Sequence, residues 1–510
     1  MKMFLLNISF CLEIIITLLI LFTNCNSPKI ARFCDLRDSE TYIREFILFR
    51  NFSSDEYYCS SSLRTRNSNS NSNSLTISFT GSPFLYTKNV PITKITPTIN
   101  QSISSCSVSP SLPRGLTISS TDCSISGIPL DSQVATDYTI IARSSNSSAS
   151  TLINLQVKIQ QAKFMAVTSS GSTSNIAVFS INSSTGALTA VSGSPFSTGV
   201  STPRYAAITP KGDFVYIAND ASASISAFSI NPNTGFLTQV SGSPFPTAPS
   251  GALNPSSLVV DPMGKFLYTA PTAGSTIFQH SINQTTGALS FVSTYPCTTV
   301  TNQSTISVDP TGKFLYLGNN SSGQGNILDA YTINSTTGAL ISISAYTLTG
   351  LQNLTSIAID PLGRFVYAIS FNTTVMGVYS IESNTGVISA ISGSPFGSLG
   401  FSGSSNIHIE PLGKFAYIAN GNSTLTGLNL NSTSGSVSAI SGSPFNSIGS
   451  GIGGIQADPT STYLYHTNGI ATGTVRGYTI NQTTGVLTAI SGSPFDTSTN
   501  TPNYIGIVSY

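Results

Sequence analysis

Few side chains in this sequence have the chemistry for acid–base catalysis. The chain has three histidines in 510 residues, and Asp, Glu, Lys and Arg together make up 8% of it, against about a quarter in an ordinary globular protein. His408 lies inside a short apolar run, Ile407-His408-Ile409. A neutral imidazole is the side chain that most often takes a proton from a reacting water. His408 is therefore the first candidate for a catalytic residue.

Gln456 and Arg204 are the two residues that we expect near His408. All three lie in copies of one repeated segment: Gln456 takes the place of His408 in the following copy, and Arg204 precedes the corresponding strand of an earlier copy. Hydrolysis needs a base that activates water and a cation that holds the developing oxyanion, which His408 and Arg204 would supply. The alternative is that His408 is a buried side chain, hydrogen-bonded between two repeats, with no part in chemistry.

The other titratable residues favour structural roles. His466 takes a position that is apolar in other copies, His280 lies near a strand end, and Arg364 replaces a recurring surface lysine. Glu410 stands where four other copies have Asp, so we expect it to cap a turn. The Cys residues are widely spaced with no His near them, and the Gly-rich loops lack a following helix or Lys. The sequence therefore predicts neither a metal nor a cofactor.

The elements that position these residues come from an internal repeat. Strands that end in Ile-Asn or a close variant are followed by two or three polar residues and then Thr-Gly or Ser-Gly, at intervals of 48 to 52 residues. The glycines are Gly186, Gly235, Gly287, Gly338, Gly386, Gly435 and Gly485. Seven copies at such a period are typical of a repeat architecture.

A second repeated motif, Asp-Pro-x-Gly with apolar residues on both sides, runs in step with the first. Its clearest copy is Asp261 to Tyr268. Each motif has the composition of a hairpin turn, so each unit of about 50 residues holds four short strands. Four strands per repeat without helical periodicity predict a seven-bladed β-propeller over 163–510.

The two ends of the array indicate how the ring closes. The first unit, which starts at Phe164, lacks an innermost strand, whereas the chain ends in Thr501 to Val508, a segment that matches Thr202 to Thr209. We expect this last strand to complete the first blade, which would remove the exposed sheet edges.

Three segments precede the propeller. Residues 1–25 resemble an export signal, residues 26–74 form a charged segment with an Asn/Ser-rich linker, and residues 75–160 alternate apolar and polar residues between Gly, Pro and Asn turns. That alternation predicts a β-sandwich. The fold class is therefore all-β, an N-terminal sandwich followed by a propeller that the C-terminal strand closes.

The cysteines fit an exported chain, in which disulfides are permitted. The segment Leu21-Phe22-Thr23-Asn24-Cys25 resembles a bacterial lipoprotein signal, whose Cys becomes lipidated. Thr23-Asn24 departs from the usual small pair, although spirochaetal lipoproteins accept looser signals; ordinary cleavage nearby is the alternative. Order along the chain favours the disulfides Cys34–Cys59 and Cys106–Cys123, but three connectivities are open.

Two parts of the chain resemble known families. The runs Leu112-Pro113-Arg114-Gly115-Leu116 and Ile125-Ser126-Gly127-Ile128-Pro129 resemble the bacterial Ig-like domains of exported proteins. Lys163 to Tyr510 resembles the seven-bladed lactonase-type propellers, which include 6-phosphogluconolactonases. The second resemblance implies His, Arg and Glu near the channel mouth. The matching motifs are scaffold motifs, however, and a fold does not by itself imply a function.

The sequence leaves two hypotheses for function. The first is a surface-anchored, non-enzymatic lipoprotein of the outer membrane, monomeric in its propeller, that binds a protein or glycan through propeller loops. The second is a lactone hydrolase that uses His408 with Arg204. A net charge of +1 argues against a nucleic-acid partner.

Overall fold

The computed structural model describes residues 74–509, apart from 170–173, 250–253, 301–303, 322–324, 402, 404–405, 448–451 and 469–472. Cys25, Cys34 and Cys59 lie outside these residues, so the predicted lipid anchor and the first predicted disulfide do too. Within the described part of the chain, no helix has the length and apolar character to cross a membrane.

The first described domain is an Ig-like β-sandwich. Its main sheet has the strand order β2 (Phe84–Thr87), β8 (Ser148–Lys158), β7 (Gln133–Arg143), β4 (Ser105–Ser109). Two short pairs complete it: β1 (Ile77–Ser78) with β3 (Thr98–Ile99), and β5 (Leu116–Ile118) with β6 (Ile125–Gly127). Alternate side chains of β7 and β8, among them Tyr138, Ile140 and Leu155, are buried in its core. The predicted disulfide Cys106–Cys123 is confirmed, with Cα atoms 5.4 Å apart.

The second domain is a seven-bladed β-propeller, as the repeat predicts. Each blade is an antiparallel sheet with a path of four strands, of which the outer three are successive in the sequence, because each turn motif connects two adjacent strands. Strands are counted from the centre of the ring outward. The first, innermost strands of the seven blades are β40 (Pro502–Ser509), β13 (Pro203–Ile208), β18 (Pro255–Val260), β22 (Ser304–Val308), β26 (Leu354–Ile359), β30 (Asn406–Ile409) and β35 (Ile452–Ala457). The second strands are β9 (Ala162–Ser169), β14 (Phe214–Asn219), β19 (Phe266–Pro271), β23 (Phe314–Ser321), β27 (Phe365–Ser370), β31 (Phe415–Ala419) and β36 (Tyr463–Asn468).

The outer half of each blade is more varied. The third strands are β10 (Asn175–Ile181), β15 (Ser224–Ile230), β20 (Gly274–Ile282), β24 (Gly325–Ile333), β28 (Met376–Ile381), β32 (Thr424–Leu430) and β37 (Thr474–Ile480). The fourth are β11 (Leu188–Ala190), β16 (Leu237–Gln239), β21 (Leu289–Val300), β25 (Leu340–Thr347), β29 (Ile388–Ala390), β33 (Val437–Ala439) and β38 (Leu487–Ala489). Four short strands, β12 (Phe196–Ser197), β17 (Phe245–Pro246), β34 (Phe445–Asn446) and β39 (Phe495–Asp496), return to pair with the third strand of their blade.

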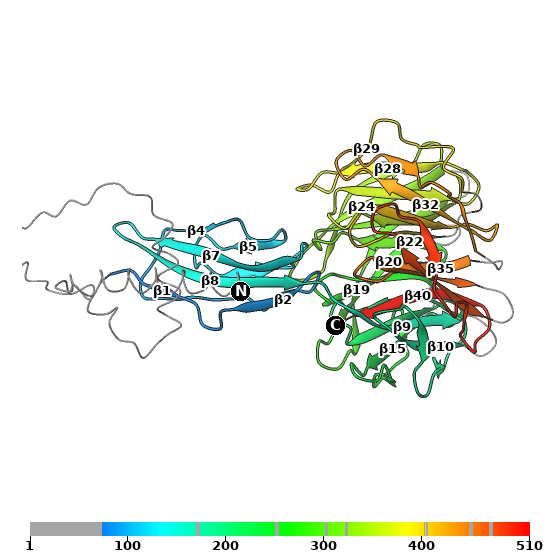
Figure 1. Ribbon diagram of the computed structural model, residues 1–510, viewed down its shortest axis with the longest axis horizontal. Helices are drawn as coiled ribbons and strands as arrows, with labels where there is room; N and C mark the ends of the chain where they lie inside the picture. Colours follow the sequence, from blue (N-terminus) through cyan, green and yellow to red (C-terminus); the bar gives the residue numbers. More distant parts are fainter. Residues whose placement is uncertain are drawn as a thin grey trace, which may run out of the picture. The chain divides into compact units, whose positions relative to one another are not determined.

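The C-terminal strand closes the ring as expected. β40 pairs antiparallel with β9, with Val508 opposite Phe164 and Ile505 opposite Val167; Figure 1 shows these two strands, red and teal, side by side. β40 also packs beside β35 on one side and β13 on the other, so the inner strands form a complete circle. One blade is thus built from both ends of the propeller segment.

The two repeated motifs meet across the boundary between neighbouring blades. Gly287, at φ +74, lies against the ring of Phe214 in the preceding blade, and the Tyr216 hydroxyl donates to the Gly287 carbonyl at 2.9 Å. The same bond from Tyr465 to Gly186, 2.7 Å long, joins the last blade to the first. The two motifs therefore form contacts between neighbouring blades in addition to forming the turns between strands.

Candidate functional site

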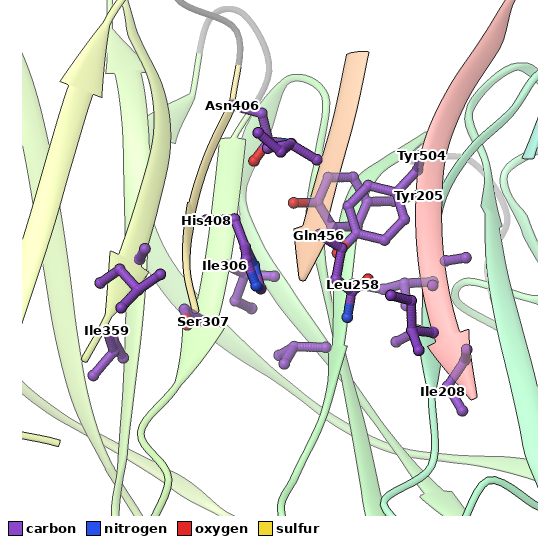
Figure 2. Close-up of a pocket in the computed structure, with 18 of the residues that line it drawn as sticks. Tyr205, Ile208, Leu258, Ile306, Ser307, Ile359, Asn406, His408, Gln456 and Tyr504 are labelled. Carbon is purple, nitrogen blue, oxygen red and sulfur yellow. The ribbon is translucent and has the colours of Figure 1, made fainter. Parts of the chain in front are cut away.

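The seven inner strands surround a cavity of about 500 Å³ at the centre of the propeller. One layer of its wall consists of the residue that stands two places before the turn motif in each blade. Its members are Ala207, Val259, Ser307, Ala358, His408, Gln456 and Gly506. This is the set that the repeat aligns with His408. The structure thus brings His408 and Gln456 to one cavity, as predicted, and shows both of them projecting into it (Figure 2).

His408 has a neutral imidazole and lies in the wall of the cavity. Its Nε2 atom is buried and has no hydrogen-bond partner among the described residues. Burial disfavours the charged imidazolium and lowers the pKa of His408 from 6.5 to about 4. The alternative interpretation, a histidine hydrogen-bonded between blades, does not hold for Nε2. Such a ring nitrogen has an unused hydrogen-bonding position, which makes His408 the candidate proton acceptor of the cavity wall.

Gln456 offers the complementary groups beside this base. It lies on β35, the inner strand next to that of His408, and its backbone pairs with Tyr465 on β36. Its side-chain amide carries both donors and an acceptor. Together with Ser307 it makes the layer around His408 partly polar although the other members are Ala, Val and Gly.

Sequence reasoning missed the second polar layer of the cavity, which lies two residues earlier on the inner strands. Tyr205, Tyr504, Asn406 and Ser356 line it. The rings of Tyr205 and Tyr504 pack with centroids 4.0 Å apart and planes at 30°, and Ser356 Oγ donates to Asn406 Oδ1 at 3.4 Å. Figure 2 shows Tyr205, Tyr504 and Asn406 towards one end of the cavity, with His408 and Gln456 in the middle and Ile208 and Ile359 towards the other end. A signal for it existed: Tyr205 and Tyr504 hold matching positions in the two segments that predicted the closure.

Arg204 does not line the cavity. Its Nη1 lies 3.0 Å from Asp220 Oδ2, and the other oxygen of that carboxylate accepts a hydrogen bond from Thr272 Oγ1 at 2.7 Å. The strand register shifts at Arg204, between Pro203 and Tyr205, and it is Tyr205 that lines the cavity. The geometry therefore separates Arg204 from His408.

The other two histidines are structural. His466 is buried, contacts Ser447 Oγ at 2.9 Å and lies beside the ring of Tyr478. His280 is buried against Phe291 and lies 3.3 Å from the Pro246 carbonyl. Glu410 caps its turn as predicted, accepting from the Phe415 backbone N–H at 3.0 Å.

The propeller wall of the cavity is electrically neutral. None of the described propeller side chains that line it is charged, and the described residues contain no group of His, Cys, Asp and Glu arranged to hold a metal ion. Binding there must use hydrogen bonds from hydroxyl, amide and imidazole groups, together with contact against isoleucines.

Comparison with known proteins supports both domains. The family model "Lactonase, 7-bladed beta-propeller" matches residues 141–248 and 242–350, and the model "Putative Ig domain" matches residues 66–158. No curated protein matches the chain.

Solved structures similar to the chain cover 68% of it and nearly all of their own length. Two are described as a "putative 6-phosphogluconolactonase": one from Bacteroides uniformis, 18% identical with a TM-score of 0.58 and 100% of its length covered, and one from Bacteroides fragilis, 21% identical with a TM-score of 0.56 and 98% covered. A third is the periplasmic gluconolactonase of Pseudomonas aeruginosa, 15% identical with a TM-score of 0.54 and 99% covered. At these identities the likeness establishes the propeller fold.

Proposed function

We propose that this protein hydrolyses an uncharged lactone in the central cavity, with His408 as the general base. The observation that carries the proposal is the buried, unpartnered Nε2 atom of His408 in the wall of a neutral cavity. The descriptions of its structural neighbours as lactonases give the reaction class. They favour the enzymatic hypothesis over the non-enzymatic binding role that the sequence put first.

The reaction needs one base, one water and a donor for the oxyanion. Water attacks the lactone carbonyl carbon and gives a proton to His408 Nε2 while the carbonyl oxygen becomes an oxyanion. The amide N–H of Gln456, on the next inner strand, donates to that oxyanion. Collapse of the intermediate breaks the ring C–O bond, and the imidazolium returns the proton to the leaving oxygen. The product is an open hydroxy acid, and His408 is neutral again.

The neutral wall favours an uncharged substrate. A phosphate group brought into this cavity would lose its hydration without a propeller cation to replace it, which is costly. Sugar hydroxyls, in contrast, match the hydroxyl and amide groups of Ser307, Asn406 and Gln456. The carboxylate formed by ring opening also finds no propeller cation in the cavity wall, so the product should dissociate readily.

The proposal is tested by hydrolysis of a lactone panel that includes an aldonolactone and its phosphorylated form. We expect turnover of the uncharged lactone by the wild type and a loss of about 10²- to 10⁴-fold in kcat for His408→Ala. Arg204→Gln serves as the matched control at a charged residue outside the cavity, and its kcat/KM should stay close to that of the wild type.

Other outcomes separate the two hypotheses. Full activity in His408→Ala would remove the base from the mechanism, and preference for the phosphorylated lactone would contradict the argument from the neutral wall. No turnover of any lactone, together with saturable binding of a protein or glycan, would restore the non-enzymatic role.

A further inference from the structure

The inner strands carry a third layer of equivalent residues, which is aliphatic in every blade. It consists of the residue that follows the layer of His408 on each inner strand, and we call it the aliphatic belt. Its members are Ile208, Val260, Val308, Ile359, Ile409, Ala457 and Ile507. At this level of the ring, the seven inner strands therefore offer hydrocarbon and no hydrogen-bonding side chain.

The belt forms part of the cavity wall. Ile208, Ile359, Ile409 and Ile507 line the cavity, and Ile208 and Ile359 are only partly buried. These two residues lie on β13 and β26, which are three places apart in the ring of inner strands. Figure 2 shows them on opposite sides of the cavity. A ligand at this level would therefore meet apolar surface on two sides.

Polarity changes along the channel from one layer to the next. The tyrosine layer, formed by Tyr205, Tyr504, Asn406 and Ser356, offers hydroxyl and amide groups towards one end of the cavity. The layer of His408 lies two residues further along the strands, about 6.6 Å away, and the belt follows one residue later, about 3.3 Å beyond it. The hydrocarbon surface thus directly adjoins the proposed general base.

The polar side chains beyond the belt are engaged with protein groups. Thr209, Gln160 and Ser509 line that end of the cavity. Thr209 Oγ1 accepts from the Phe214 backbone N–H at 3.1 Å. Ser509 Oγ donates to Gln160 Oε1 at 2.9 Å, and Gln160 Nε2 donates to the Pro210 carbonyl at 3.1 Å. The belt is therefore the surface that a ligand group meets first on this side of His408.

We propose that the substrate is a lactone with an alkyl substituent, and that the aliphatic belt binds this substituent. The inference rests on the proposed lactone hydrolysis and deepens it by naming the substrate class. With the carbonyl carbon at the level of His408, ring hydroxyls face Asn406 and the alkyl group reaches Ile208 and Ile359. Burial of the alkyl group removes apolar surface from water, which favours binding. A hydroxyl group in its place would be desolvated against the belt without a hydrogen-bond partner.

A series of neutral lactones tests the assignment. The substituent, on the ring carbon that bears the ring oxygen, is lengthened from methyl to ethyl and propyl. The kcat/KM of the wild type should rise about fourfold with each added methylene. A matched series in which each chain ends in a hydroxyl group should show no such rise. Values of kcat/KM that do not change, or that fall, as the alkyl chain grows would overturn the inference.

Two substitutions at one belt position separate polarity from size. Val and Thr are both β-branched and similar in shape, so Ile359→Thr differs from Ile359→Val chiefly by a hydroxyl. Ile359→Val should keep a rise of about threefold or more per methylene, whereas Ile359→Thr should reduce it to less than about twofold. Equal melting temperatures would show that both variants are folded. Equal dependence on chain length in the two variants would show that the substituent does not contact the belt.

A binding experiment separates this assignment from the proposed reaction. Neutral lactams with the same substituents, titrated calorimetrically, should bind the wild type about fourfold more tightly for each added methylene. Such tightening without turnover of any lactone would support the assignment and reject the reaction. Turnover that does not depend on the alkyl chain would overturn the assignment and leave the reaction standing. Failure of the wild type both to bind and to hydrolyse would overturn both.

Discussion

At the scale of single residues, the proposed chemistry depends on an uncharged cavity wall and a neutral His408. Burial keeps His408 unprotonated, and its Nε2 atom has no hydrogen-bond partner among the described residues. Arg204, the cation that sequence reasoning paired with His408, is engaged with Asp220 instead. In the proposed reaction the oxyanion is therefore stabilised by a hydrogen bond from Gln456 rather than by a positive charge.

The pH dependence of turnover follows from the pKa of His408. The value is lowered to about 4, so the base is neutral at pH 7 and becomes protonated, and inactive, only as the pH falls through that value. We expect kcat/KM to be level from pH 7 to about 5 and to fall roughly tenfold per pH unit below about 4. The measurement is a pH–rate profile corrected for spontaneous hydrolysis. A decline centred near 6.5 would mean that His408 is solvated like an ordinary histidine.

The position of His408 could be predicted from the sequence, whereas the matching positions of Tyr205 and Tyr504 gave only a signal for two members of the tyrosine layer and none for its contacts. Alignment of the repeats by their turn motifs places His408 and Gln456 at equivalent positions, and equivalent positions of a closed ring face one channel. Tyr205 and Asn406 lie in blades about 200 residues apart in sequence and both line the cavity, and the meeting of side chains within a channel leaves no periodic signal. For Arg204 the sequence prediction was wrong. Arg204 is next to Tyr205, which lines the cavity, but its own side chain contacts Asp220 instead.

At the scale of elements, the repeated motifs serve both to turn the chain and to join the blades. Each turn glycine has a positive φ, as its motif predicts, but the contact with an aromatic ring of the preceding blade appears only in three dimensions. A Cβ atom added to Gly287 would come within 2.4 Å of the Phe214 ring. Phe214 is itself buried, so the ring has little room to move away.

Two glycine substitutions separate the backbone effect from the packing effect. Gly442 also has a positive φ, of +82, yet a Cβ atom there would meet nothing within 4 Å. Gly442→Ala should therefore lower the free energy of unfolding by about 1 kcal/mol, and Gly287→Ala by about 2–4 kcal/mol. Urea denaturation gives both values. Equal losses would show that the contact between blades contributes nothing beyond backbone strain.

At the scale of the whole molecule, closure by β40 joins the two ends of the propeller segment. The strand buries Ile505, Ile507 and Val508 between the first blade and its neighbours and also contributes Tyr504 to the cavity. The sequence predicted this closure because the terminal segment copies an inner strand. It also predicted the Ig-like domain, which is confirmed.

Deletion of residues 501–510 tests the closure. Loss of three buried aliphatic side chains, at about 2 kcal/mol each, and of an entire strand pairing should lower Tm by about 10 °C or more. A matched control is the substitution Ser509→Ala, which removes one hydroxyl at the end of the strand and should leave Tm nearly unchanged. An unaltered Tm in the deletion variant would contradict closure by this strand.

Export and anchoring remain a proposal that concerns the whole molecule. We propose that Cys25 is lipidated and holds the protein in the cell envelope, on the strength of the apolar stretch that precedes it. Expressed in a bacterial host, the wild type should incorporate radiolabelled palmitate and remain with the membrane fraction, and Cys25→Ala should do neither. Cys11→Ala, inside the predicted signal, is the control. Equal labelling of wild type and Cys25→Ala would rule out the anchor.

The central claim is that the propeller channel is the functional site, and a structure of the protein with a bound neutral lactam tests it most directly. We predict the lactam ring inside the cavity, with its carbonyl oxygen within about 2.6–3.2 Å of the Gln456 amide nitrogen and a water between the carbonyl carbon and His408 Nε2. A lactam bound only at the outer loops, with the channel free of it, would contradict the account.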